Sequence, residues 1–145
     1  MDNEKEKLLY FKNSQIELLK ARFDKIVPDV KTNEQLKIDM IDSYNIESFD
    51  NKKLVFLFKR KVSLIPQSLF TIEVEYIVAL DFADNTKKEF QDKNDELGEL
   101  INSKMEKIIN LSRVPAKAST LISDITINNN SNPVVTPPSF IKNTF

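Results

Sequence analysis

Two long segments of alternating apolar and polar residues constrain the fold more than any other feature of the chain. They run from Lys53 to Ile65 and from Ser68 to Phe82, and only Pro66, Gln67 and the first residue of the second segment separate them. A period of two is typical of strands that bury one face. The apolar positions are Leu54, Phe56, Phe58, Val62 and Leu64 in the first segment, where Arg60 interrupts the row, and Phe70, Ile72, Val74, Tyr76, Val78, Leu80 and Phe82 in the second. Because the connection is so short, we expect an antiparallel hairpin.

The opposite face of this hairpin carries charge at one end and apolar residues at the other. Lys59 and Lys61 lie on the first strand, and Glu73 and Glu75 lie on the second. Opposite charges that pair across the strands favour one register. After Glu75 the same face turns apolar, at Ile77 and Ala79. We therefore expect another element or another subunit to cover that end, and we expect the chain to form an oligomer.

The segments before the hairpin are less regular. Residues Gln15 to Val27 fit a helical stripe as well as a strand, and we favour a strand from Glu17 to Val27 that ends at Pro28. Before it, residues Glu4 to Asn13 are compatible with a short helix. Residues Leu36 to Tyr44 alternate with a period of two, which predicts another strand.

Helical periodicity appears only after the hairpin. Residues Ala83 to Asp95 are polar and are expected to form a connection, and a helical stripe then starts at Leu97. A second helix is expected after it, with Ser112 as its cap and Pro115 in its first turn, where the missing amide proton costs nothing. Residues Asn128 to Asn132 end this helix.

This order of elements predicts a domain organisation and a fold class. We expect an N-terminal segment (residues 1–14), one domain (15–128) and an extended tail that contains three prolines (129–145). Because strands precede helices, the expected class is α+β, with an antiparallel sheet of three to four strands followed by two helices packed on one face.

The composition excludes most catalytic chemistry. The chain has no His and no Cys, so it contains no Ser-His-Asp triad, no Cys-His pair, no disulfide and no zinc site of the usual nitrogen and sulfur type. Its single glycine, Gly98, is too few for a dinucleotide fingerprint or a phosphate loop. We therefore expect a binding module rather than an enzyme, with no cofactor and no metal.

Charge and hydropathy narrow the range of partners. The 21 basic and 22 acidic residues are mixed along the chain without a basic stripe, so nucleic acid is not an expected partner. The longest apolar runs fall far short of the roughly 20 residues that cross a bilayer. Residues Met1 to Lys7 alternate in charge, unlike a secretory signal. We expect no membrane insertion and a cytoplasmic location.

Several groups of residues have both a functional and an ordinary interpretation. Glu73 and Glu75 are two apart on one strand face, which suits general acid-base work but is also typical of a solvated strand. The acidic residues between Asp81 and Asp95 do not fit the spacing of a calcium-binding EF-hand, so we interpret them as a solvated loop. Phe56, Phe58, Phe70 and Tyr76 could line an apolar peptide groove or simply form core. The tail from Val134 to Phe140 is either a strap that binds a partner or a disordered end.

Three runs of sequence resemble the SecB-type export chaperones. Residues Phe70 to Glu75 resemble the family's Phe-x-x-Glu-Val strand, and residues Ile108 to Thr126 resemble its helix, Phe-Pro-Tyr-Ala-Arg-like segment and second helix. Residues Pro137 to Phe140 resemble the family's Leu-x-Pro-x-x-Phe ending. The chain departs from the pattern between Tyr76 and Phe82, where the family has a turn with glycine.

The resemblance implies a homotetramer, a dimer of dimers, that holds unfolded polypeptides in apolar grooves without hydrolysing nucleotide. The partners that it implies are unfolded client polypeptides and, for export, the SecA motor. The alternative is a SecB-like module that is dedicated to one partner, such as an antitoxin or a phage or host protein. The candidate client-binding or interface residues are Phe56, Phe58, Phe70, Tyr76, Ile77, Ala79, Val134 and Val135, and the candidates for an acidic partner contact are Glu73 and Glu75.

Overall fold

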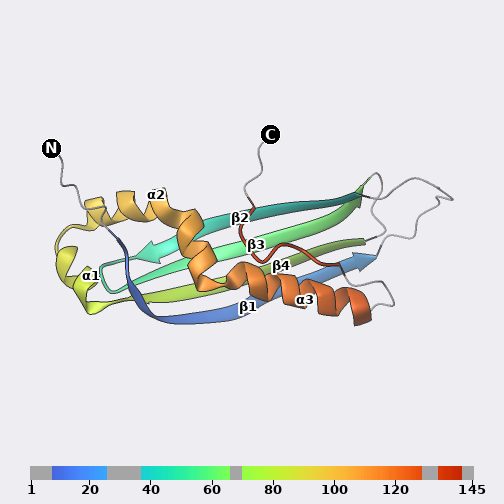
Figure 1. Cartoon of the computed structure of the whole chain (residues 1–145), viewed down its shortest axis with the longest axis horizontal. Coiled ribbons are helices and arrows are strands. Elements are labelled where there is room, and N and C mark those ends of the chain that lie inside the picture. Colours follow the sequence, from blue (N-terminus) through green and yellow to red (C-terminus); the bar gives the residue numbers. More distant parts are fainter. Residues whose placement is uncertain (1–7, 26–36, 66–69, 129–133, 142–145) are drawn as a thin grey trace.

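A four-stranded antiparallel sheet forms one layer of the molecule and helices form the other (Figure 1). The computed structural model describes residues 8–25, 37–65, 70–128 and 134–141. In chain order the elements are β1 (Phe11–Lys25), β2 (Lys37–Phe49), β3 (Lys53–Ile65), β4 (Phe70–Phe82), α1 (Asp84–Glu89), α2 (Asn94–Ser112) and α3 (Val114–Asn128). The strand order is β1-β4-β3-β2 and all neighbours are antiparallel. The α+β class predicted from the sequence is confirmed.

The two central strands pair antiparallel as predicted, and their opposite charges meet across the strands. Lys59 pairs with Glu75 and Lys61 with Glu73 across β3 and β4, and the Nζ atom of Lys59 lies 3.4 Å from Oε1 of Glu73 on the diagonal. Burial along β4 alternates strictly between buried and half-buried positions. The connection between the two strands lies outside the described residues.

The short helix predicted before the first strand is wrong where the structure describes it. Residues 11–13 already belong to β1, because Phe11 pairs with Phe82 and the two rings stack with centroids 5.0 Å apart. Pairing with β4 thus overrides the local propensity. The register of β1 also shifts between Phe11 and Asn13 and between Leu18 and Lys20. Each irregularity shifts the apolar residues out of a period of two, which is why this segment resembled a helix.

Strand β2 is longer than predicted and ends at Phe49 rather than at Tyr44. Its register with β3 shifts between Ile46 and Ser48, so the alternation fails there. The tight turn to β3 is closed by Asp50, whose Oδ1 atom accepts hydrogen bonds from the backbone N–H groups of Lys52 (2.7 Å) and Lys53 (2.9 Å). These two bonds lower the pKa of the Asp50 carboxyl, since they favour its charged form.

The segment predicted as a connection, residues 83–95, contains the short helix α1. Its sequence looks polar because a helix of this length buries little, but Thr86 within it and Phe90 after it are buried. Helices α2 and α3 occur where the sequence predicts two helices. Arg113 joins them with φ 64°, and Ser112 Oγ accepts a hydrogen bond from the backbone N–H of Val114 (3.2 Å), as expected of a cap.

The core lies between the helices and one face of the sheet. It is built from the alternate positions of β3 and β4 and from the apolar stripes of α2 and α3. Helix α2 approaches the end of β2 closely at the chain's single glycine: a Cβ atom on Gly98 would lie 2.8 Å from Cζ of Phe49. Glycine is used here for close packing of a helix on an aromatic ring.

Candidate functional site

The four aromatic candidates lie on the helix-covered face of the sheet. The side chains of Phe56 and Phe58 are fully buried, and Phe70 and Tyr76 are each 6% exposed. The hydroxyl of Tyr76 donates a hydrogen bond to the backbone oxygen of Lys117 on α3 (3.4 Å), and burial raises the pKa of this hydroxyl. In this structure Phe56 and Phe58 therefore form core, and Phe58 also packs against Phe140 of the tail.

Ile77 and Ala79 lie on the other face of the sheet, as their alternation predicts. They are half-buried, and the register places Ile77 beside Leu57 and Ala79 beside Val55 of β3. We call these four residues the open face, because the helices α1–α3 all lie on the opposite side of the sheet (Figure 1). The open face is a short apolar strip on two central strands.

Glu73 and Glu75 share this side of the sheet with the open face. The Glu73 carboxylate is bracketed by the Nζ atoms of Lys59 and Lys20, each 3.4 Å from Oε1. Partial burial opposes the shift, but attraction to Lys59 and Lys20 and hydrogen bonds from both lower the pKa of Glu73. A carboxylate held in its charged form by two lysines is unsuited to act as a general acid, which favours the solvated-strand interpretation.

Two neighbouring cavities form a groove along β1, on the side of the helices. The first has a volume of about 350 Å³ and is lined by Leu9, Tyr10, Phe11, Lys12, Asn13, Ser14, Leu80, Leu111 and Ser112. The second, of about 650 Å³, is lined by Ile16, Leu18, Tyr76, Arg113, Ala116, Lys117, Thr120, Leu121 and Asp124. We call these two cavities together the β1 groove. It follows an edge strand of the sheet from the start of β1 to the middle of α3.

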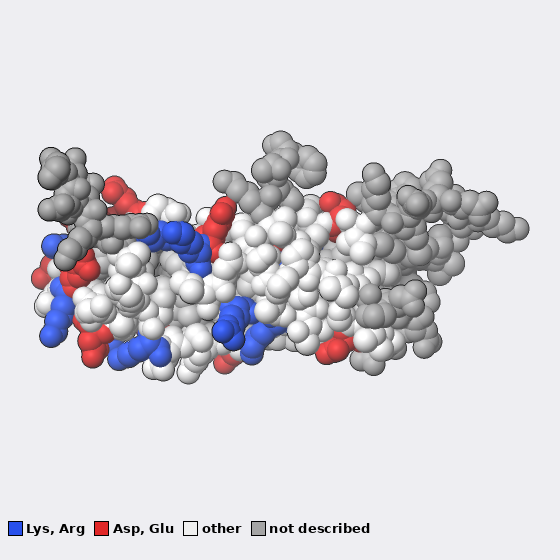
Figure 2. Space-filling view, viewed as in Figure 1, with Lys and Arg blue, Asp and Glu red and all other residues white. Residues whose placement is uncertain are grey.

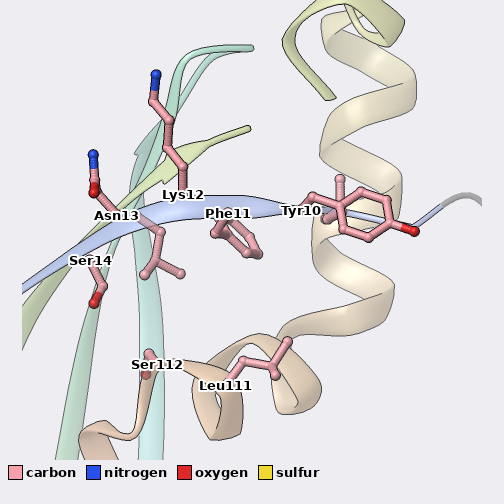
Figure 3. A pocket seen from close by; sticks show the side chains of 9 residues that line it. Tyr10, Phe11, Lys12, Asn13, Ser14, Leu111 and Ser112 are labelled. Carbon is pink, nitrogen blue, oxygen red and sulfur yellow. The ribbon is translucent and has the colours of Figure 1, made fainter. Parts of the chain in front are cut away.

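The walls of the β1 groove are largely apolar. Phe11 and Leu111 face each other across the first cavity, whereas Lys12 points away from it (Figure 3). The side chains of Leu18 and Leu111 are 47% and 70% exposed, which is high for leucine. Except for Tyr76, none of the groove's lining residues was a candidate in the sequence analysis, because the start of β1 was expected to be helical and its bulges conceal the strand.

Charge is distributed unevenly over this side of the molecule. Figure 2 shows many lysine, arginine and acidic side chains towards the end where α1 lies, a further basic cluster near the middle and separate acidic side chains beyond it. The second cavity has Arg113, Lys117 and Asp124 among its apolar lining residues, so it suits a ligand that offers both apolar side chains and polar groups.

The tail crosses the sheet beside α3 as an extended strap (Figure 1). Helix α3 holds its first part: Thr126 Oγ1 accepts a hydrogen bond from the N–H of Val134 (2.9 Å), Ser123 Oγ donates to its carbonyl (2.9 Å), and Ser119 Oγ donates to the carbonyl of Thr136 (2.5 Å). Val134 is buried, with 8% exposure, whereas Val135 is 78% exposed. In this structure the tail binds to its own chain.

A buried ion pair that the sequence analysis did not identify holds the rest of the tail. Arg60, which interrupts the apolar face of β3, lies opposite Asp42 of β2, and both side chains are fully buried. Their contact is bidentate: Nε and Nη2 of Arg60 donate to the two carboxylate oxygens at 2.8 Å each. The same guanidinium donates to the backbone oxygens of Pro137 (2.6 Å) and Ser139 (2.9 Å).

The last described residues of the tail complete this arrangement. The N–H of Phe140 donates to Oδ1 of Asn110 (2.8 Å), and the N–H of Ile141 donates to Oδ2 of Asp42 (3.0 Å). The ring of Phe140 packs edge-on against Tyr44 and Phe58, with centroid distances of 5.9 and 6.4 Å. We call the site formed by Asp42, Tyr44, Phe58, Arg60 and Asn110 the tail seat.

The described residues offer no sign of a metal centre or of a membrane span. No group of three or more acidic side chains converges on one point in the described part of the chain. None of the helices described above is long and apolar enough to cross a bilayer.

Comparison with known proteins shows a likeness of fold. No protein-family model and no curated protein sequence matches the chain. A solved structure of Mycobacterium tuberculosis Rv1957, a SecB-like chaperone in complex with a ChAD peptide from the Rv1956 HigA1 antitoxin, matches with a TM-score of 0.51 at 11% identity, covering 86% of this chain and 86% of that chain. A protein of unknown function from Streptococcus agalactiae matches with a TM-score of 0.39 at 13% identity, covering 90% of this chain and 99% of that one. The chain therefore has a SecB-like fold.

Proposed function

We propose that the protein is a SecB-like, ATP-independent chaperone that binds unfolded or non-native polypeptides. The observation that carries this proposal is the β1 groove, a long and largely apolar channel beside an edge strand on a SecB-like fold. An extended polypeptide can pair with a sheet edge through its backbone and place alternate side chains in apolar cavities. This mode of binding needs no nucleotide, no metal and no catalytic group, in keeping with a composition without His or Cys.

The second candidate is an interaction module dedicated to one partner. The specific observation in its favour is that the structural neighbour, the SecB-like chaperone Rv1957, is bound to a peptide from an antitoxin. A dedicated module and a general chaperone can use the same groove. They differ in the number of unrelated polypeptides they accept.

We further propose that the protein acts as a cytoplasmic homo-oligomer, a tetramer built as a dimer of dimers on the SecB pattern, with protein export and the SecA motor as its context. Support comes from the open face, which is apolar on two central strands, and from exposed Leu18 and Leu19 on the edge strand β1. Long edge strands and apolar strips are covered in most stable proteins. Light scattering at micromolar concentration should give a multiple of the 16.8 kDa chain mass; a monomer would contradict this part of the proposal.

Aggregation of chemically denatured proteins tests the chaperone function. Several unrelated denatured proteins are diluted with and without the protein, in the absence of ATP, and light scattering is followed. We expect suppression for most of them, and a loss of suppression in Leu18→Asp and Leu111→Asp, because a charge in the groove opposes apolar binding. Ile127→Asp is the matched control, since Ile127 is 52% exposed on α3 outside the groove. Suppression of none of the proteins would favour the dedicated module.

A further inference from the structure

The tail seat has the chemistry of a peptide-binding site. Its polar groups contact the tail almost entirely through backbone atoms: Arg60 donates to two carbonyl oxygens, and Asp42 and Asn110 each accept one N–H. Backbone groups are the same in every polypeptide, so this pattern recognises an extended chain rather than one sequence. Two contacts depend on particular side chains: the aromatic contact of Phe140 with Tyr44 and Phe58, and the hydrogen bond that Nη1 of Arg60 donates to Oγ1 of Thr136 (3.0 Å).

The tail occupies this seat shallowly. Pro137 and Pro138 are exposed, and Ser139, Phe140 and Ile141 are only half-buried. The two prolines fill no deep pocket; they restrict the chain to an extended conformation and carry no N–H that would need a partner. Residues 137–141 belong to no helix or strand, so the described sheet and helices keep all their own hydrogen bonds when these residues leave.

The floor of the seat is unusual for a hydrophobic core. An ion pair buried between β2 and β3 is often no more stabilising than apolar residues of similar volume, because desolvation of both charges offsets their attraction. Arg60 could be replaced by an apolar residue without breaking the alternation of β3, yet it carries its charge to the floor of a groove where a peptide backbone lies. The position is therefore better explained by recognition of a polypeptide than by stability.

From these contacts we infer that the tail seat is a second polypeptide-binding site, which the chain's own tail occupies and which an extended segment of another polypeptide takes by displacing residues 137–141. The ligand is an extended segment with an aromatic residue two or three positions after a proline. This inference rests on the proposed function, since it adds a second binding site for the same class of ligand. It also assigns the tail the role of a competitor.

Displacement is measured with a fluorescein-labelled peptide that has the sequence of residues 134–141. In the wild-type chain the attached tail competes at an effective concentration in the millimolar range, so the peptide should bind weakly. In full-length Phe140→Ala, where the tail has lost its contacts with Tyr44 and Phe58, we expect binding at least about tenfold tighter by fluorescence anisotropy. Full-length Asn110→Ala, which loses one hydrogen bond to the tail, should also release the tail while lowering the affinity for the peptide.

Changes in the peptide test the recognition without any effect on folding. Methylation of the two amide nitrogens that correspond to Phe140 and Ile141 removes the donors to Asn110 and Asp42, and should weaken binding to the Phe140→Ala chain at least about tenfold. Methylation at the position of Val135, whose side chain is 78% exposed, is the control and should have little effect.

Three results would overturn the inference. The first is equal affinity for the peptide in the wild-type chain and in Phe140→Ala, when circular dichroism shows that both are folded. If Phe140→Ala is unfolded, binding of the methylated peptides to the wild-type chain tests the inference in its place. The second is full affinity of the doubly methylated peptide. The third is a change of oligomeric mass in Phe140→Ala, which would assign the seat to the tail of a second copy. The aggregation assay tests the proposed function separately. Suppression of aggregation without peptide binding would support the chaperone function and contradict the second site. Peptide binding without suppression of aggregation would support the second site and contradict the chaperone function.

Discussion

Breaking the buried pair of Asp42 and Arg60 should destabilise the protein strongly, and removing both charges should cost less than the sum of the two single losses. Both side chains are fully buried, and their two hydrogen bonds of 2.8 Å engage both carboxylate oxygens and two N–H donors of the guanidinium. In Asp42→Leu or Arg60→Met the remaining partner stays buried as an unpaired charge. Such single losses cost about 3–5 kcal/mol of the free energy of unfolding.

The double variant Asp42→Leu/Arg60→Met has no unpaired charge to bury. It loses the hydrogen bonds to Thr136, Pro137, Ser139 and Ile141 of the tail, each with a net value of about 0.5–1.5 kcal/mol. The double variant should therefore be destabilised by about 2–6 kcal/mol, less than the roughly 6–10 kcal/mol that the two single variants sum to. The midpoints of these two ranges differ by a coupling free energy of about 4 kcal/mol.

Urea-induced unfolding, followed by circular dichroism at one fixed protein concentration, measures all four chains. The fixed concentration matters because association would stabilise the folded state by mass action. The reasoning would be refuted if each single variant lost less than about 1 kcal/mol of the free energy of unfolding. It would also be refuted if the two single losses added up to the loss in the double variant within about 0.5 kcal/mol. Either result is typical of an ion pair that is exposed to water.

Three further predictions test other parts of the structure. Val74→Asp should unfold the chain, because Val74 is fully buried, while Ile77→Asp on the open face should stay folded and lower the oligomeric mass; circular dichroism and light scattering distinguish the two. Asp50→Asn should lower the urea midpoint at pH 7, and by less at each step as the pH is lowered into the acid range: the pKa of Asp50 is lowered by folding, so its stabilisation is complete above the unfolded pKa and is lost as the pH falls through the folded pKa. Glu73→Gln removes ion pairs that face solvent, including that with Lys59, so the free energy of unfolding should change by less than about 1 kcal/mol and client holding should be unchanged.

The sheet centre and the two long helices could be predicted from the sequence because their patterns are uninterrupted. Strand β3 has the predicted bounds and β4 has its predicted end at Phe82, and Lys59 and Lys61 pair across the strands with the two glutamates, as opposite charges favour. In such strands each residue's face follows from its number alone. A helical period of apolar residues likewise predicted α2 and α3, since each helix buries one apolar stripe against the sheet.

The β1 groove could not be predicted, because it depends on features that periodicity does not reveal. Strand β1 has two irregularities in its register, and its first residues are held by Phe82 of a strand far away in the sequence. The first cavity also needs Leu111, which is 70% exposed at the end of α2. An exposed leucine in a helical stripe gives no sequence signal of the surface to which it contributes.

Arg60 was visible in the sequence as a charged residue in an apolar row, but its role could not be predicted because its partners come from other parts of the fold. A charged residue in the apolar row of a central strand must find a partner or leave the core. One partner, Asp42, lies in a strand whose extent was underestimated, and the others are carbonyl groups of a tail with no periodicity at all. The tail and the buried charge therefore depend on each other. Without the tail, some N–H donors of Arg60 lose their acceptors. Without Arg60, residues 137–141 keep only two hydrogen bonds to the described part of the chain, at Asn110 and Asp42. A feature that breaks the pattern of a strand is thus the best place in such a sequence to look for a binding site.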